Sequence, residues 1–285
     1  MQVTDFTLYR QPKVDGHCHV LDPERFAYAD DVAYRPRGQE TGSAAYFAEV
    51  MAAYGVRHAL LVGPNSGYGS DNRCLLDAIA RGQGRFKGVA VVPADTSSDK
   101  LQALRDQGIV GIAFNYSLNG LPYYADTGPL MERLAALGMF VQVQIEQAQL
   151  VQLGPRLAGT GAQVLVDHCG RPAVSEGVHG AGFDALLRMA DGGRTTVKLS
   201  GYAKFSQSGY PYADTLPFTQ ALLDSFGPQH CIWASDWPFL KAGHRLDYGT
   251  QLQEFGRRVP DAAQRHDILW RTPMRLFGFD AGSVA

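Results

Sequence analysis

The chain has 285 residues, of which 45% are hydrophobic and 19% charged, and its formal net charge is −2. This balance is that of a globular domain, and so small a charge argues against nucleic acid or an anionic membrane surface as a partner. The length is close to the roughly 250 residues of a barrel built from alternating strands and helices, so we expect one domain over residues 1–285. No apolar run approaches the roughly 20 residues that a membrane-spanning helix requires.

The N-terminal segment and the cysteines favour a cytoplasmic protein. Residues 1–12 contain no apolar core of the kind that a secretory signal has. The four cysteines have no paired spacing, so we expect reduced thiols. Cys18 and Cys169 each stand beside a histidine of interest. We expect both to be small buried residues, because strand neighbours of an inward side chain point outward.

Eight short segments rich in Val, Ile, Leu and Phe alternate with amphipathic stretches along the chain. Near-continuous apolar runs of this length are typical of parallel strands covered by helices. The predicted strands are 13–19, 57–63, 88–92, 109–115, 139–145, 163–168, 195–200 and 230–236.

The amphipathic stretches carry helix start and stop signals. One helix is predicted from Ser43 to Gly55, and another begins at Asp126 or Thr127 and ends before Gly138. Both have a polar cap, apolar residues at steps of three and four, and a terminal glycine. Further helices are predicted at 70–82, 97–107, 147–158, 181–191, 214–226, 247–258 and 261–270.

This alternation predicts an α/β protein with the (β/α)8 TIM barrel fold. Parallel neighbouring strands need crossover connections, and each crossover usually holds a helix. A doubly wound sheet is the alternative, but such sheets usually have a glycine-rich turn after the first strand. The residues that follow 13–19 contain no such turn.

Three histidines and one aspartate stand at predicted strand ends. His17 and His19 end the first strand, His168 ends the sixth, and Asp236 ends the eighth. Active residues of TIM barrels collect at the carboxyl ends of the strands, so we expect these four to meet at one mouth. Imidazoles and a carboxylate can together hold a divalent ion or polarise a carbonyl group.

Further polar residues should line the same mouth. In the fifth strand Gln142 and Gln144 alternate with apolar residues, which places them inside the barrel, with Gln144 nearer the ligand. Arg171 and Lys204 could bind an anionic substrate, although either could instead form a loop salt bridge. The predicted substrate-binding residues are Asn65, Asn115, Tyr116, Gln144, Arg171, Ser200 and Lys204.

Two further features of the loops bear on the mouth. The five other histidines are expected to be structural or solvated, although His244, on the loop after the eighth strand, could reach the mouth. The segment 205–217, rich in Ser, Gly, Tyr and Pro, is a candidate lid, with an ordinary surface loop as the alternative.

Three motifs at these strand ends carry a family resemblance. They are His-Cys-His at 17–19, Asp-His-Cys-Gly-Arg-Pro at 167–172 and Ser-Asp-Trp-Pro at 235–238. In this order they resemble the amidohydrolase superfamily, within the amidohydrolase-2 branch that contains 2-pyrone-4,6-dicarboxylate lactonase and related lactonases. The resemblance runs essentially from end to end of the chain.

The resemblance implies that the protein hydrolyses a small lactone. Asp236 would act as the general base on water, and His17, His19 and His168 would polarise the lactone carbonyl, directly or through a metal ion. The same scaffold also hosts two alternatives, a lactone isomerase and a metal-dependent decarboxylase. A non-catalytic binding barrel is a fourth reading.

The resemblance also bears on the cofactor. It implies either no ion or one divalent ion, with zinc preferred, and the ligands would be His17, His19, His168 and Asp236. A binuclear site is not expected, because Gln144 stands where two-metal members have a histidine.

One departure from the family pattern bears on the substrate. The family arginine of the fourth strand is replaced by Ala113. This favours a lactone with one carboxylate, or a neutral sugar lactone contacted by Asn115, Tyr116 and Gln144. We therefore expect an anionic or polyhydroxylated lactone of carbohydrate or aromatic catabolism as the partner, with homo-oligomerisation left open.

Overall fold

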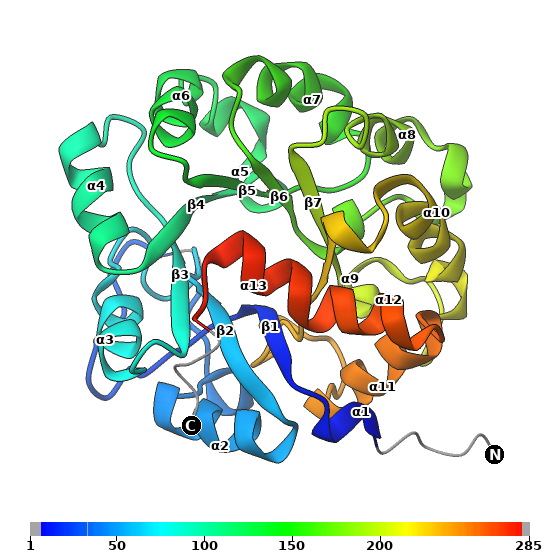
Figure 1. Cartoon of the computed structure of the whole chain (residues 1–285). Coiled ribbons are helices and arrows are strands. Elements are labelled where there is room, and N and C mark those ends of the chain that lie inside the picture. Colours follow the sequence, from blue (N-terminus) through cyan, green and yellow to red (C-terminus); the bar gives the residue numbers. More distant parts are fainter. Residues whose placement is uncertain (1–6, 33, 281–285) are drawn as a thin grey trace.

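The computed structural model describes residues 7–32 and 34–280. Its centre is a sheet of eight parallel strands in chain order, with the helices outside it (Figure 1). This arrangement confirms the predicted (β/α)8 barrel. The strands are β1 (Lys13–Cys18), β2 (Val56–Val62), β3 (Phe86–Ala90), β4 (Ile109–Asn115), β5 (Phe140–Gln144), β6 (Val164–Val166), β7 (Thr195–Leu199) and β8 (Cys231–Trp233).

The ring closes between β1 and the segment that follows β8. Cys18 and Trp237 form a parallel bridge, and the Trp237 carbonyl accepts a hydrogen bond from the His19 amide at 2.8 Å. The His17 carbonyl accepts from the Asp236 amide at 2.9 Å. Closure therefore places the first and last site motifs on adjacent segments.

A buried carboxylate reinforces this closure. Asp15 Oδ1 accepts from the Ser235 amide at 2.9 Å, and its Oδ2 accepts from the Tyr248 hydroxyl at 2.8 Å. A Cβ atom at the neighbouring Gly16 would lie 2.7 Å from the carbonyl oxygen of Trp233. Only glycine allows β1 to approach β8 this closely.

The helices surround the barrel in the order of the crossovers. No helix among the residues described has the length and apolarity needed to cross a bilayer. The helices are α1 (Thr7–Arg10), α2 (Ala44–Ala53), α3 (Arg73–Arg81), α4 (Ser98–Asp106), α5 (Tyr116–Tyr123), α6 (Gly128–Ala136), α7 (Gln149–Thr160), α8 (Ala181–Arg188), α9 (Tyr202–Phe205), α10 (Leu216–Phe226), α11 (Tyr248–Arg258), α12 (Ala262–His266) and α13 (Thr272–Phe277).

Two helical regions differ from the sequence-based expectation. The segment predicted as one helix at 261–270 is α12, which continues through a π-helical turn, η6 (Asp267–Arg271), into α13. Helix α5 was not predicted, because Gly120 and Pro122 interrupt its sequence pattern.

The predicted start of α6 is correct in position, but the Thr127 hydroxyl donates to the Tyr124 carbonyl instead of capping the helix.

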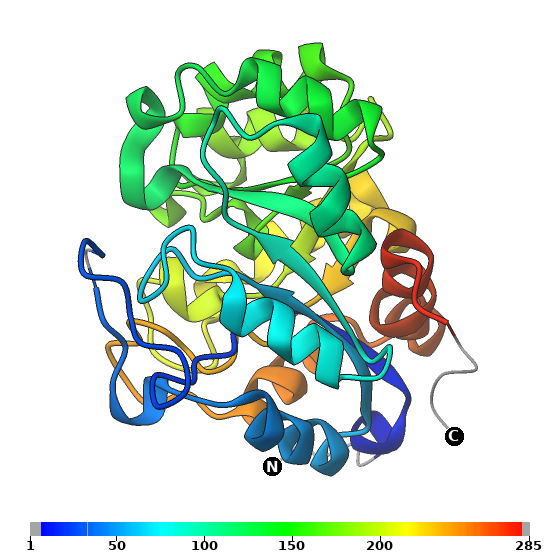
Figure 2. The same ribbon diagram turned by 90° about the vertical axis from the view of Figure 1, so that its left-hand side faces the viewer.

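The two ends of the barrel are chemically different. α12 and α13 cross the amino-terminal end of the strands, and the segment after β1 rises at the opposite end (Figures 1 and 2). Near α13, Phe277 and Phe279 pack with an inner apolar cluster that includes Val14, Leu60 and Leu165. The inward positions nearer the other end are polar. The functional groups therefore face away from the apolar floor, as in TIM-barrel enzymes.

Candidate active site

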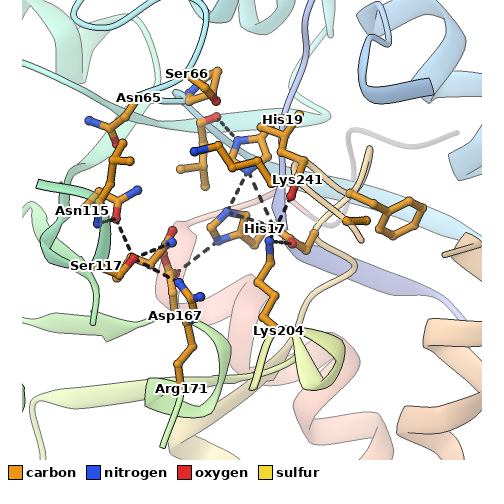
Figure 3. A pocket seen from close by; sticks show the side chains of 18 of the residues that line it. His17, His19, Asn65, Ser66, Asn115, Ser117, Asp167, Arg171, Lys204 and Lys241 are labelled. Carbon is orange, nitrogen blue, oxygen red and sulfur yellow. Dashed lines mark hydrogen bonds and ion pairs between the residues drawn. The ribbon is translucent and has the colours of Figure 1, made fainter. Parts of the chain in front are cut away.

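A cavity of about 470 Å³ lies at the carboxyl ends of the strands. Figure 3 shows it from close by, with His17, His19 and Lys204 on one side and Asn115, Ser117 and Arg171 on the other. The loops that form its walls follow seven of the eight strands, which is how a barrel gathers residues far apart in the sequence.

The four residues predicted to be catalytic are brought together beneath this cavity. His17 Nε2 lies 3.3 Å from His19 Nε2. Asp236 Oδ1 lies 3.8 Å from His17 Nε2, 3.7 Å from His19 Nε2 and 3.5 Å from His168 Nε2. One carboxylate oxygen thus faces three imidazole nitrogens.

Strained backbone places several of these side chains. His168 (φ 52°), Arg171 (φ 45°) and Asp236 (φ 61°) all adopt the left-handed conformation, which is uncommon for residues other than glycine and clusters at functional sites. Gly201 leaves room for the imidazole, since a Cβ atom there would lie 2.7 Å from the ring of His168. Ser200 Oγ, 3.0 Å from His168 Nδ1, fixes the orientation of that ring.

A fully buried polar network underlies His17. Lys198 Nζ lies 2.9 Å from Asp167 Oδ1, 2.7 Å from Gln142 Oε1 and 3.1 Å from His17 Nδ1. Asp167 Oδ1 is itself 3.2 Å from His17 Nδ1. Sequence reasoning did not assign Lys198 or Asp167 to the site. The signal that could have found Lys198 is a lone cation inside a predicted strand that carries no other charge.

His17 and His168 are held neutral beside an ionised carboxylate. Burial, with Lys198 beside it, lowers the pKa of His17 to about 4, and burial lowers the pKa of His168 to about 3 although Asp236 opposes this. Burial would raise the pKa of Asp236, but Lys204 and His168 outweigh it and hold this pKa well below its usual range. At neutral pH the ionised Asp236 can accept a proton.

Lys204 contacts Asp236 directly. Its Nζ lies 2.8 Å from Asp236 Oδ2 and 3.4 Å from the Leu240 carbonyl. Lys204 lines the cavity as predicted, yet its charge is already paired with Asp236. The salt-bridge alternative therefore describes Lys204 in this structure.

The opposite wall is organised around a serine that the sequence did not single out. Ser117 Oγ accepts from Arg171 Nη1 at 3.1 Å and from Gln144 Nε2 at 3.0 Å, and donates to Asn115 Oδ1 at 2.9 Å. Arg171 Nη2 also lies 3.6 Å from Glu146. All five side chains line the cavity, as does Asn65. We call Asn115, Ser117, Gln144 and Arg171 the polar wall.

Two expectations about the mouth are corrected by the structure. Tyr116 is fully buried and packs against Phe114 and Tyr124, because the chain turns into α5 at this residue and directs its ring outside the cavity. Ser200 does not line the cavity either, since it lies behind His168 and acts through that ring.

The candidate lid at 205–217 does not cover the cavity. The buried Arg258 guanidinium donates to the carbonyls of Pro211 and Tyr212 and so ties this segment to α11. The rim is formed instead by Tyr34 and by the segment 239–246, which includes His244. His244 thus reaches the mouth, with its Nε2 3.1 Å from the Tyr212 hydroxyl.

The donor set fits one divalent ion. Among the residues described, His17, His168 and Asp236 each offer one ligand atom within 4.8 Å of the others. A tetrahedral zinc ion with metal–ligand bonds of about 2.0–2.1 Å separates its ligands by about 3.3 Å. The distances of 3.5 and 3.8 Å from Asp236 to the two imidazoles are close to this value, and His19 lies beside them.

Comparison with known proteins agrees with this geometry. The chain is 31% identical over 272 residues to the 4-sulfomuconolactone hydrolase of Rhizobium radiobacter, which covers 93% of this chain and 89% of that protein. It is also 31% identical over 279 residues to the 2-pyrone-4,6-dicarboxylate hydrolase of Comamonas testosteroni, with the same coverage of 93% and 89%.

A solved structure shows the same fold. The probable 2-pyrone-4,6-dicarboxylic acid hydrolase of Acinetobacter baumannii, solved with citric acid bound, superposes with a TM-score of 0.84. The two sequences are 27% identical, and the match covers 94% of this chain and 99% of that one. The family model described as Amidohydrolase matches residues 14–279. The chain therefore belongs to the amidohydrolase family.

Proposed function

We propose that this protein hydrolyses a small lactone at the cavity described above. The observation that carries the proposal is the ionised Asp236, which faces three imidazole nitrogens at 3.5 to 3.8 Å at the base of an open cavity. Hydrolysis of a cyclic ester needs a base for water and a group that stabilises negative charge on the carbonyl oxygen. This site supplies both.

The chain's own residues divide these tasks. Asp236 takes the proton of the attacking water, while Lys204 keeps that carboxylate ionised. His17 and His19, which both line the cavity, face the carbonyl oxygen of the bound ester. A divalent ion held by His17, His168 and Asp236, with His19 beside it, would add Lewis-acid polarisation of the same carbonyl.

The polar wall supports a substrate with one acidic group. Arg171 presents a planar guanidinium, whose fork matches a carboxylate or a similar anion. Ala113 lines the cavity where a longer cationic side chain would give a second anchor. The names of the two relatives from R. radiobacter and C. testosteroni describe a lactone and a pyrone bearing acidic groups. We therefore favour a lactone with a single carboxylate.

A screen of muconate-type and sugar lactones, with acid release followed by a pH indicator, tests this function. We expect turnover of monocarboxylated lactones, and NMR of the product should show the open-chain hydroxy acid. A rearranged lactone as product would mean that the enzyme is an isomerase, and loss of CO₂ would mean that it is a decarboxylase. Either product would overturn the proposal.

Elemental analysis of protein purified without added zinc addresses the ion. A stoichiometric divalent metal assigns the metal-assisted form of the reaction. Turnover that persists after the ion has been removed with a chelator assigns carbonyl polarisation to the histidines alone.

A further inference from the structure

Lys198 is a buried cation that the proposed reaction does not use. It has no exposed surface, is the fourth of the five residues of β7, and reaches the edge of His17 that points away from the cavity. We propose that Lys198 is a positioning residue that keeps the proton of His17 on Nε2. His17 then presents an N–H donor to the reaction centre.

The first support comes from the hydrogen bonds beneath the ring. The Lys198 ammonium has three N–H groups and three acceptors in reach: Asp167 Oδ1 at 2.9 Å, Gln142 Oε1 at 2.7 Å and His17 Nδ1 at 3.1 Å. His17 Nδ1 accepts from Lys198 only if it carries no proton.

Both carboxylate oxygens of Asp167 accept hydrogen bonds from side chains other than His17. Its Oδ1 accepts from Lys198, and its Oδ2 accepts from Gln142 Nε2 at 3.1 Å. A protonated Nδ1 would instead direct its N–H toward Asp167, 3.2 Å away, and would leave the third Lys198 N–H without an acceptor. Buried donors without partners are rare in folded proteins.

The second support comes from the opposite end of the ring and is independent of Lys198. His19 Nδ1 lies 2.8 Å from the Val62 carbonyl, which can only accept, so Nδ1 of His19 carries a proton. In a neutral imidazole protonated on Nδ1, Nε2 is an acceptor, and His19 Nε2 faces His17 Nε2 at 3.3 Å. In the metal-free protein, two lone pairs at this distance would repel each other. A proton on His17 Nε2 satisfies both nitrogens.

This arrangement has a consequence for ion binding. A ligand nitrogen must offer a lone pair, so coordination by His17 Nε2 requires its proton to move to Nδ1, where Asp167 accepts it. The move removes the acceptor of one Lys198 N–H. Lys198 therefore favours carbonyl polarisation by the His17 N–H and opposes an ion at the same nitrogen.

Nitrogen NMR of the histidine-labelled, metal-free protein tests this directly, with the His17 signals assigned by comparison with His17→Asn. We expect the Nε2–H form in the wild-type protein and the Nδ1–H form in Lys198→Met. A zinc titration of the metal-free proteins should show about 10-fold tighter binding by Lys198→Met, the usual size of such indirect effects on metal sites.

Lys13→Met is the matched control. Lys13 is also fully buried, but its Nζ donates to the backbone carbonyls of Gln11 and Tyr54 at the other end of the barrel. The control should change neither the His17 tautomer nor the zinc affinity.

Several results would overturn the proposal. They are an Nδ1–H signal for His17 in the wild-type protein, unchanged or weaker zinc binding by Lys198→Met, or the same changes in Lys13→Met. If Lys198→Met does not fold, the wild-type spectrum alone decides. The inference concerns the site of the proposed lactone hydrolysis, but neither readout uses a substrate, so failure of that function is a separate result.

Discussion

The two fully buried lysines, Lys13 and Lys198, occupy opposite ends of one barrel and serve different purposes. Burial lowers the pKa of Lys13 to about 7 and also lowers the pKa of Lys198. Lys13 donates its hydrogen bonds to backbone carbonyls. The partners of Lys198 are instead the side chains of Asp167, Gln142 and His17. Burial of a charge is therefore not the sign of a functional site. The sign is a buried charge whose partners themselves face a cavity.

The same contrast holds for the surroundings of these lysines. At the floor, His58 stacks on Phe279 with ring centroids 4.6 Å apart, within apolar packing. At the mouth, His17 and His168 have ring centroids 4.9 Å apart but point their nitrogens toward Asp236. Histidine contributes to packing at the floor, whereas at the mouth we propose that it takes part in the reaction. Stability and catalysis are thus separable by substitution.

The largest effect in free energy is expected at the floor. Phe277→Ala removes a buried ring that contacts Phe140 and Phe279, and should lower the free energy of unfolding by about 3–5 kcal/mol. The variant should keep its kcat/KM at a temperature where it remains folded. Denaturant unfolding and steady-state kinetics check this. A large loss of activity in the folded variant would show that floor and mouth are coupled.

The next effect concerns the base. Asp236→Asn should lower kcat by about 10²-fold or more, because a carboxamide cannot take a proton from water. Thermal unfolding should show an intact fold. The matched control is Asp184→Asn. Asp184 pairs with Arg188 on α8, so this variant should be fully active. Near-normal turnover in Asp236→Asn would remove Asp236 from the mechanism.

Arg171 tests the polar wall. Arg171→Gln should raise KM for a monocarboxylated lactone by about 10-fold, the usual worth of a hydrogen bond to a charged group. KM for a neutral sugar lactone should change far less. Comparison of KM between the two substrates, with Arg188→Gln as the surface control, isolates charge recognition from general damage. An equal rise in KM for both lactones would argue against an acidic group at this wall.

Lys204 tests how a neighbouring charge controls the ionisation of Asp236. It holds the pKa of Asp236 below its usual range, so the base stays ionised as the pH falls. Lys204→Met raises this pKa, and the acid limb of the pH–rate profile should move to higher pH. Activity would then be lost at a higher pH than in the wild type, with the plateau near neutral pH retained. An unmoved acid limb would mean that Lys204 does not act on the base.

The smallest effect is expected at Ser117, which lines the cavity and hydrogen-bonds to Arg171 and Gln144. Ser117→Ala removes the hydroxyl that orients Arg171 and Gln144 and should raise KM by about 5-fold, close to 1 kcal/mol. Ser117→Thr keeps the hydroxyl and should restore KM. If Ser117→Ala alters kcat instead of KM, the polar wall takes part in the chemical step.

The sequence by itself determined the barrel and the end of it that carries the candidate site. Apolar runs and capped amphipathic stretches predicted each of the eight strands, because these patterns depend on neighbours along the chain. The topology then placed His17, His19, His168 and Asp236 at one mouth. Neighbours along the chain could not show that Tyr116 turns into the core, since Gly120 and Pro122 conceal the helix that turns it.

Only the tertiary structure decided which side chains share space across different strands. Ser117 in the first turn of α5 joins Gln144 at the end of β5 and Arg171 after β6. Lys198 of β7 meets His17 of β1 and Asp167, which directly follows β6. Such side-chain contacts depend on how the strands are staggered around the barrel and on where the barrel closes. The physical reason is that alternation along a strand sets the face of a side chain, whereas its height and its partners are set by the neighbouring strands.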